Sequence, residues 1–264
     1  MTDWLRFMAR LAQAQQVAAT TLGPLAGPSQ AEVEQAVGGR MPPLAADGHR
    51  RDSAWRDGLT ILLDDFDSVT VPAPARAVMV SLRDSQAGPV ESLADRFLRG
   101  AVDSAEAGPA LYVAAALQVY FTRLAAELPL ASLRLLPRRG LCPCCGSTPV
   151  SGMVTASGQG ARYLHCSLCA TAWNHVRAVC ISCGESRSLS LKEIEGDSGA
   201  VKAETCDGCG SYAKMLYQSR DPSVDPFADD LATLGLDFLV AEAGWARHAP
   251  NPLLLMASSG GDGG

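Results

Sequence analysis

Apolar residues recur every three to four positions through the first half of this 264-residue chain, and alternating apolar and polar positions are scarce there. A repeat of about 3.6 residues is typical of helices that bury one face. The pattern predicts an all-helical N-terminal domain over residues 1–137. Gly- and Pro-rich loops separate the predicted helices, which cover 3–20, 31–37, 53–66, 74–84, 89–99 and 105–128.

The pattern changes after residue 137. Apolar runs shorten, Gly, Ser, Cys and Thr become frequent, and "RYLHC" (162–166) and "AWNHVRAVC" (172–180) indicate short strands. The helical pattern returns over 225–248, with Asp225 as a candidate N-cap and Pro226 at the first helical position. The closing "ASSGGDGG" is typical of a flexible tail. The chain is therefore predicted to be α+β, with domains over 1–137, 138–217 and 218–264.

All nine cysteines lie between residues 142 and 209. Two residues separate the cysteines of each of four pairs, a spacing that lets a tight turn aim both thiolates at one metal ion. A glycine, which tolerates the positive φ such a turn often needs, follows three of the pairs. The pairs are Cys142 with Cys145, Cys166 with Cys169, Cys180 with Cys183, and Cys206 with Cys209.

The spacing between the pairs indicates two tandem modules. The first and third pairs start 38 residues apart, and the second and fourth start 40 residues apart. Long gaps inside a module fit a β-hairpin, and the short gap between the second and third pairs fits a connection between modules. We therefore assign the first two pairs to one four-thiolate site and the last two to another, with an interleaved cross-brace as the alternative.

Metal binding explains four such pairs better than redox or disulfide chemistry does. A thioredoxin-type dithiol belongs at the start of a helix in a βαβ unit, and structural disulfides are rare in a reducing cytoplasm. Four sulfur ligands in a tetrahedron suit zinc or a rubredoxin-like single iron, and iron–sulfur clusters also use four thiolates. The expected cofactors are two iron ions or two zinc ions, and the spacing does not separate them.

Three other residues lie close to the cysteine pairs. Cys144 is the ninth cysteine, left over when both sites are filled, and is either a small space-filling residue or a reactive thiol. His165 and His175 flank the second pair and are alternative ligands.

Charge and composition argue against several classes of protein. Lys and Arg number 22 against 28 Asp and Glu, a net charge of −6, which argues against a protein that works by neutralising nucleic-acid phosphates. A small basic cluster, Arg134, Arg138 and Arg139, keeps nucleic-acid binding as an alternative. No apolar run approaches the ~20 residues of a membrane span, and the charged N-terminus does not resemble a signal peptide, so we expect a cytoplasmic protein without membrane insertion.

No arrangement of residues indicates an enzyme. Neither a Ser/His/Asp constellation nor a phosphate-binding glycine loop is present. A rubredoxin-like electron carrier is the nearest alternative of this kind.

Four segments, "LCPCCGSTPVSGMV", "RYLHCSLCATAWNHVRAVCISCG", "AETCDGCGSYAKMLY" and "DPFADDLATLGLDFLVAEAGWAR", resemble the formate dehydrogenase accessory protein FdhE family. The resemblance implies a cytoplasmic maturation factor, not an enzyme, with rubredoxin-like iron sites. It also implies binding to the catalytic subunit of respiratory formate dehydrogenase before that subunit is exported. Transferred by position, the resemblance assigns metal binding, and the ability to bind the partner, to the eight paired cysteines.

Overall fold

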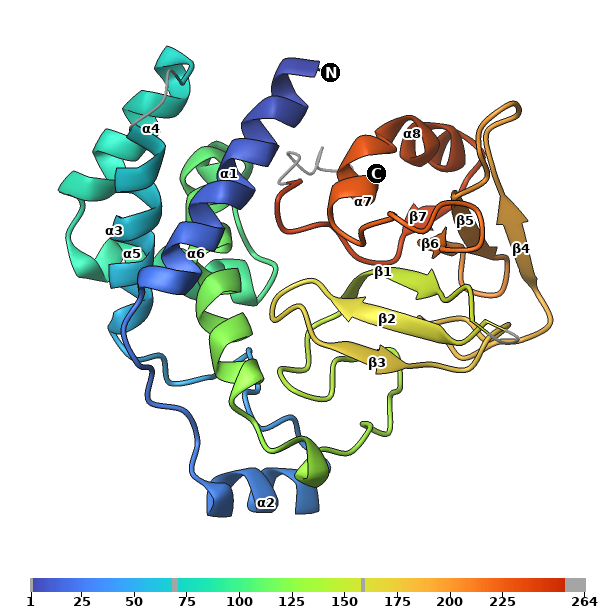
Figure 1. The fold of residues 1–264 in the computed structure, drawn as a ribbon, viewed down its shortest axis with the longest axis horizontal. Coiled ribbons are helices and arrows are strands. Elements are labelled where there is room, and N and C mark those ends of the chain that lie inside the picture. The colour runs from blue at the N-terminus through green and yellow to red at the C-terminus, as the bar shows by residue number, and fades with distance from the viewer. Residues whose placement is uncertain (1, 68–70, 158–159, 255–264) are drawn as a thin grey trace, which may run out of the picture. The chain divides into compact units, whose positions relative to one another are not determined.

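The computed structural model describes residues 2–67, 71–157 and 160–254 (Figure 1). It divides into two compact units, which are described separately. The first unit comprises Met1–Gly27, Leu44–Glu127 and Pro252–Gly264, and the second comprises Pro28–Pro43 and Leu128–Asn251. The predicted flexible tail at 257–264 lies outside the described residues. The predicted domain boundaries after residues 137 and 217 stay a prediction.

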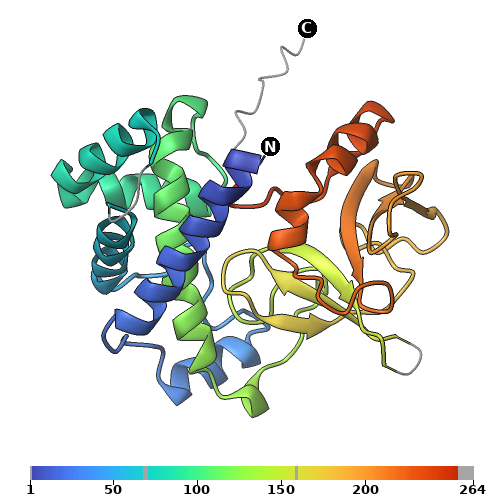
Figure 2. The same cartoon turned by 45° about the horizontal axis from the view of Figure 1, so that its top comes forward.

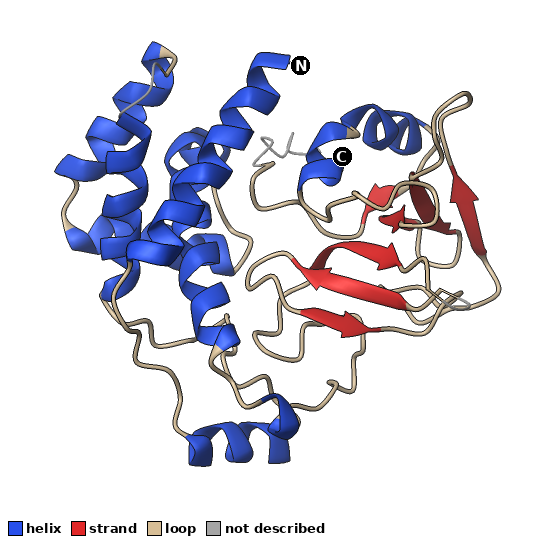
Figure 3. Ribbon diagram, viewed as in Figure 1, coloured by secondary structure: helices blue, strands red, loops and turns tan. Residues whose placement is uncertain are grey.

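The first unit is helical, as predicted (Figure 3). Its long helix α6 contacts each of the other helices of the unit, and both ribbon views place α1 alongside it (Figure 2). Helix α6 has no continuous polar face, and its buried residues lie on every side, because it is the central helix of the unit. The helices are α1 (Thr2–Thr21), α3 (Ala54–Asp67), α4 (Ala73–Asp84), α5 (Ala87–Leu98) and α6 (Ala107–Ala126), with a short 3-10 turn η1 (Ser104–Glu106) before α6.

Two polar contacts connect the packed helices of this unit. Gln118 interrupts the apolar run of α6 and is only 7% exposed. Its side-chain oxygen accepts a hydrogen bond from Gln15 Nε2 at 2.8 Å. Helix α1 is further tied to α3 by an ion pair between Arg10 and Asp65 at 2.6 Å. These contacts offset part of the cost of removing Gln118, Arg10 and Asp65 from water when α1, α3 and α6 pack together.

The second unit holds a seven-stranded sheet. The strand order is β3-β2-β1-β6-β5-β4, with β7 beside β6. Helix α2 (Gln30–Gly38) and the 3-10 turn η2 (Leu130–Ser132) belong to the same unit. The strands are β1 (Pro149–Val154), β2 (Arg162–Cys166), β3 (Ala172–Asn174), β4 (Leu189–Lys192), β5 (Val201–Cys206), β6 (Ser211–Tyr217) and β7 (Ala246–Arg247).

The two predicted modules share this one sheet. Strands β1, β2 and β3 come from the first module and pair antiparallel, as do β4, β5 and β6 of the second. The modules join where β1 pairs parallel with β6, with Gly152 opposite Met215. A Cβ atom at Gly152 would lie 2.6 Å from Met215 Sδ, so a larger residue there would force the Met215 side chain to move.

A buried ion pair also connects the modules. Arg162 of β2 is 2% exposed and donates to Glu204 of β5 at 2.7 Å. Its other donors reach the carbonyl oxygens of Val176 and Val179, in the connection between the modules. A buried guanidinium needs a carboxylate and several acceptors to offset its desolvation. The alternating pattern of "RYLHC" identifies a strand but does not reveal this partner.

The C-terminal helical segment is shorter and more broken than a helix over 225–248. The Asp225 carboxylate accepts from the backbone N–H groups of Phe227 and Ala228, but the helix begins at Ala228, two residues after the predicted first helical position, with Phe227 at the N-cap. The segment then divides into α7 (Ala228–Ala232) and α8 (Leu234–Glu242), and residues 246–247 form β7. A continuous helix over the whole range is therefore wrong.

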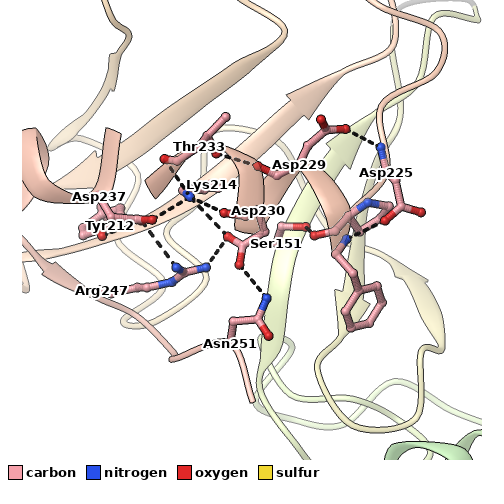
Figure 4. A network of polar contacts seen from close by, with 12 residues as sticks. Ser151, Tyr212, Lys214, Asp225, Asp229, Asp230, Thr233, Asp237, Arg247 and Asn251 are labelled. Carbon is pink, nitrogen blue, oxygen red and sulfur yellow. Dashed lines mark hydrogen bonds and ion pairs between the residues drawn. The ribbon is translucent and has the colours of Figure 1, made fainter. Parts of the chain in front are cut away.

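The break in this segment has a tertiary cause. Lys214 of β6 is completely buried and donates its Nζ to the carbonyl oxygens of Asp230 and Thr233, at 2.8 and 3.1 Å. Asp230 lies in α7, and Thr233 is the residue between α7 and α8 (Figure 4). An ammonium group buried without acceptors is costly, and we infer that its need for them favours the break at Thr233.

The charge of Lys214 is balanced within the same network. Its Nζ lies 2.6 Å from Asp237 Oδ2 and 3.5 Å from Asp230 Oδ1. Arg247 of β7 pairs with both carboxylates, and Asn251 donates to Asp230 at 2.8 Å. Two acids therefore offset two bases, and the network anchors α7, α8 and β7 to strand β6 (Figure 4).

Candidate metal centres

The first cluster brings together the first two cysteine pairs. Cys142 and Cys145 lie in the turn before β1, and Cys166 and Cys169 lie in the turn where β2 ends. The Sγ atoms of Cys142 and Cys169 are 3.5 Å apart, and those of Cys145 and Cys166 are 3.4 Å apart. All four Sγ atoms lie within 4.8 Å of one another.

The second cluster repeats this arrangement with the last two pairs. Cys180 and Cys183 precede β4, Cys206 is the last residue of β5, and Cys209 lies in the turn after it. The Sγ separations are 3.7 Å for Cys180 with Cys209 and 3.7 Å for Cys183 with Cys206. The predicted sequential pairing is confirmed, and the interleaved cross-brace is wrong.

The sulfur separations fit a tetrahedral metal and not disulfides. A metal about 2.3 Å from each of four tetrahedral sulfurs requires sulfur–sulfur distances of about 3.8 Å. A disulfide requires about 2.05 Å, and all nine cysteines are free thiols. In each cluster, the four sulfurs are thus placed to bind one metal ion, either zinc or iron.

Each turn uses the same backbone geometry to aim its sulfurs. The residue after the second cysteine lies in the left-handed region in all four turns: Gly146 (φ 79°), Ala170 (φ 54°), Gly184 (φ 79°) and Gly210 (φ 65°). In three turns the N–H of this glycine donates to the carbonyl of the first cysteine, at 2.9 to 3.0 Å. The turn of Cys166 and Cys169 has Ala170 at this position, and this alanine adopts the same left-handed conformation as the glycines of the other three turns.

Electrostatics in the first cluster favour a bound cation. Burial raises the pKa of the Cys142, Cys145 and Cys166 thiols. Four thiolates held this close without a cation would repel one another in a poorly hydrated space. A divalent ion supplies the opposite charge that lets all four ionise.

The second cluster differs mainly in its exposure to solvent. All four cysteines of the first cluster are buried, whereas Cys183 and Cys209 of the second are exposed. Burial raises the pKa of Cys206 to about 12. At Cys209 burial, the largest single cause, acts in the same direction, but hydrogen bonds from Ser211, Cys183 and Cys180 together outweigh it and lower the pKa to about 7.

Cys144 lies against the first cluster without being one of its four members. It is 1% exposed, and its thiol interacts with those of Cys142 and Cys169. Thiols without solvent access react slowly, so its burial favours the space-filling interpretation. Its assignment as a reactive thiol stays a prediction.

The two histidines lie outside the clusters. Among the described residues, the groups that can hold a metal ion consist of cysteines alone. His175 Nδ1 is within 2.7 Å of Arg162 and 2.9 Å of the Val176 carbonyl. Burial lowers the pKa of His165 and of His175. Substitution of a histidine for a cysteine ligand is therefore not supported.

The segment just before the first cluster contains contacts that sequence patterns did not indicate. Trp173 Nε1 donates to the Arg139 carbonyl at 2.9 Å. A Cβ atom at Gly140 would lie only 2.0 Å from the carbonyl oxygen of Ile181, inside the third cysteine turn. Gly140 therefore packs against the second module two residues before the first ligand of the first module. The only sequence feature that could have indicated this contact is the glycine that precedes the first cysteine turn.

Comparison with known proteins identifies the family. Three family models match the chain in order: "FdhE, N-terminal" over residues 1–137, "FdhE, central domain" over 141–177, and "FdhE, C-terminal domain" over 178–254. The chain belongs to the FdhE family. The resemblance inferred from the cysteine-bearing segments is confirmed.

Individual FdhE proteins agree with this assignment. A "Protein FdhE homolog" of Edwardsiella ictaluri is 42% identical over 256 residues, which cover 96% of this chain and 82% of the relative. "Protein FdhE" of Escherichia coli is 37% identical over 254 residues, with the same coverage. The crystal structure of the FdhE protein from Pseudomonas aeruginosa matches with a TM-score of 0.87 and 35% identity, covering 97% of this chain and 90% of that one.

The described helices of this FdhE-family chain were compared with the requirements of a membrane span. Among residues 2–67, 71–157 and 160–254, no helix combines the length and the apolar character that a span requires.

Proposed function

We propose that this FdhE-family chain is a cytoplasmic maturation factor that binds the catalytic subunit of a respiratory formate dehydrogenase. Two metal-loaded four-cysteine sites, one per module, stabilise the surface that it presents. It acts as an accessory protein and not as an enzyme. The observation that carries the proposal is a pair of four-sulfur clusters, each shaped for one metal ion, in a chain of this family.

The eight paired cysteines are the proposed ligands: Cys142, Cys145, Cys166 and Cys169 in the first site, and Cys180, Cys183, Cys206 and Cys209 in the second. Each ion stabilises the fold of its module, because metal-binding free energy becomes folding free energy. The proposed ions are iron in a rubredoxin-like site or zinc, and both fit the sulfur separations.

An anaerobic affinity purification tests the proposal. The tagged chain is isolated from its own cytoplasm, captured proteins are identified by mass spectrometry, and metal per chain is measured in the same sample. We expect a formate dehydrogenase catalytic subunit and about two metal ions per chain. Capture of transcription machinery or nucleic acid instead would contradict the proposal.

The chain supplies a matched control for the metal requirement. Cys144→Ser changes a buried cysteine outside both clusters, whereas Cys166→Ser removes a sulfur of the first cluster. We expect Cys144→Ser to keep the metal and the partner and Cys166→Ser to lose both. Partner capture by a Cys166→Ser chain that has lost the metal of the first site would show that this metal is not required.

Exposure of the second cluster favours one alternative, a rubredoxin-like electron carrier. Electron transfer requires a metal site close to the surface, and Cys183 and Cys209 are exposed. Anaerobic voltammetry of the iron-loaded chain tests this function. Reversible reduction that disappears in Cys183→Ser would support it, and a redox-silent metal would exclude it.

A further inference from the structure

A hollow on the second unit gathers three arginines from two distant segments of the chain. It has a volume of about 430 Å³. Arg40, which follows helix α2, lies on one side, and Arg134 and Arg139, between η2 and the first cysteine turn, lie on the other. All of these residues belong to the same compact unit. A hydrogen bond from Gln30 Nε2 to Ser132 Oγ, at 3.3 Å, ties the two segments together.

No acidic residue lines this hollow. In the described part of the chain, none of the three arginines forms an ion pair with a carboxylate. Arg134 instead donates to the carbonyls of Ala131 and Leu133, both at 2.7 Å. The two acids of α2 are engaged at its other end, where Glu32 bonds to Ser29 and Glu34 bonds to Gln30.

The three arginines give the hollow a positive charge in an acidic molecule. The chain carries a net charge of −6, and several of its other arginines, such as Arg51, Arg96 and Arg162, are paired with carboxylates. Three arginines without such partners, facing one hollow, create a local positive potential. The planar guanidinium donors match the oxygens of phosphate groups.

The walls of the hollow are held in place by the fold. The backbone at Arg139 is fixed by the hydrogen bond from buried Trp173, and Met41 N donates to the Ala36 carbonyl at 2.8 Å. Met41 and Leu135 line the hollow with apolar surface and are 56% and 40% exposed. A ligand with an anionic end and an organic part would satisfy both kinds of surface.

We propose that this hollow binds a small organic molecule bearing a diphosphate group. Three positive charges match the charge of a diphosphate, and the volume lies within the range of about 300–1,000 Å³ usual for small-molecule sites. The diphosphate contacts Arg40, Arg134 and Arg139, and the organic part lies on Met41 and Leu135. The site is separate from both cysteine clusters, and its occupation does not depend on the function proposed above.

Calorimetric titration of the metal-loaded, full-length chain with inorganic pyrophosphate tests this site. We expect saturable binding of one pyrophosphate per chain. Arg40→Gln and Arg139→Gln should each weaken it by about tenfold, as expected for losing a charge-assisted hydrogen bond. Arg40→Lys keeps the charge but loses the planar fork, so it should weaken binding less than Arg40→Gln.

Arg220→Gln is the matched control, because it removes one positive charge from an exposed arginine of the same unit outside the hollow. It should leave the affinity unchanged. Metal content and thermal midpoint are measured for every variant, so that a folding defect is separated from a binding defect.

Three results would overturn the proposal. Absence of saturable pyrophosphate binding at millimolar concentration is the first. Equal weakening by Arg220→Gln and Arg40→Gln is the second, since it would reflect net charge alone. Binding of a glutamate-rich peptide, competed by salt and not by pyrophosphate, is the third, and it would identify the hollow as a docking surface for an acidic protein segment.

Discussion

The two cysteine clusters have nearly the same sulfur geometry but very different surroundings. Sulfur separations of 3.4 to 3.5 Å in the first cluster compare with 3.7 Å in the second. The first cluster is enclosed on all sides, whereas Cys183 and Cys209 leave the second open to solvent. The same turn motif therefore produces one sheltered site and one accessible site.

Neighbouring segments account for this difference. A Cβ atom at Gly146, in the first turn, would lie 3.1 Å from Pro42 of the 28–43 segment. At Gly184 and Gly210, in the second cluster, nothing lies within 4 Å of such an atom. Strand β4, which follows the third turn, is also at the edge of the sheet. Ligand identity comes from the turn, but accessibility comes from what the rest of the chain packs against it.

The largest expected effect is loss of a buried sulfur ligand. Cys166→Ser should abolish metal binding at the first cluster and lower the free energy of unfolding by more than about 4 kcal/mol, because the metal substitutes for apolar burial. Cys183→Ser should affect only the second cluster and cost less, since water solvates the exposed serine. Denaturant unfolding with metal analysis measures both.

Cys144→Ser serves as the control for this pair of variants. It should keep both metals and cost about 1 kcal/mol, the usual cost of a small change in a packed interior. Equal destabilisation by Cys166→Ser and Cys183→Ser would show that the two clusters contribute equally to the stability of the chain.

The next effect concerns Gly140, which links the two modules. Gly140→Ala would place a methyl group 2.0 Å from the Ile181 carbonyl oxygen. The backbone must move, and we expect a loss of about 3 kcal/mol in the free energy of unfolding. Because the contact joins the approach to the first cluster with the third turn, metal retention should fall at both clusters.

Gly88→Ala is the matched control for Gly140→Ala. Gly88 lies in helix α5, with nothing within 4 Å of an added Cβ. It should be neutral or stabilise the chain by up to about 1 kcal/mol. Thermal unfolding of both variants measures the contrast, and a harmless Gly140→Ala would contradict the close packing.

A smaller effect is the order in which the metals are lost. Under a chelator, the second cluster should release its metal at least about tenfold faster than the first, equivalent to about 1.4 kcal/mol in barrier height. Alkylation followed by peptide mass mapping should label Cys183 and Cys209 before the buried ligands. Simultaneous release and labelling would mean that both sites open together.

The smallest effect tests whether all four turns share one backbone geometry. Ala170→Gly should stabilise the chain by about 1 kcal/mol, because alanine pays a penalty at φ 54° that glycine does not. Gly210→Ala, at φ 65° with space around it, should cost a similar amount. Opposite signs of similar size in unfolding experiments would confirm the equivalence, and matching signs would contradict it.

Local features of the sequence determined much of this protein. The 3.6-residue pattern identified the helices of the first unit, because amphipathic burial leaves a periodic trace in the chain. The Cys-x-x-Cys spacing and the 38- and 40-residue offsets identified the eight clustered cysteines and their sequential pairing, because a turn of fixed length aims its own sulfurs.

Contacts between distant residues were decided only by the tertiary structure. The parallel pairing of β1 with β6, the break after α7 at the carbonyls taken by Lys214, and the hollow shared by Arg40 and Arg139 each join segments more than fifteen residues apart in sequence. The unequal exposure of the two clusters has the same origin. Turns with the same cysteine spacing do not reveal which segments will cover them, since burial depends on packing by the whole unit and not on the turn itself.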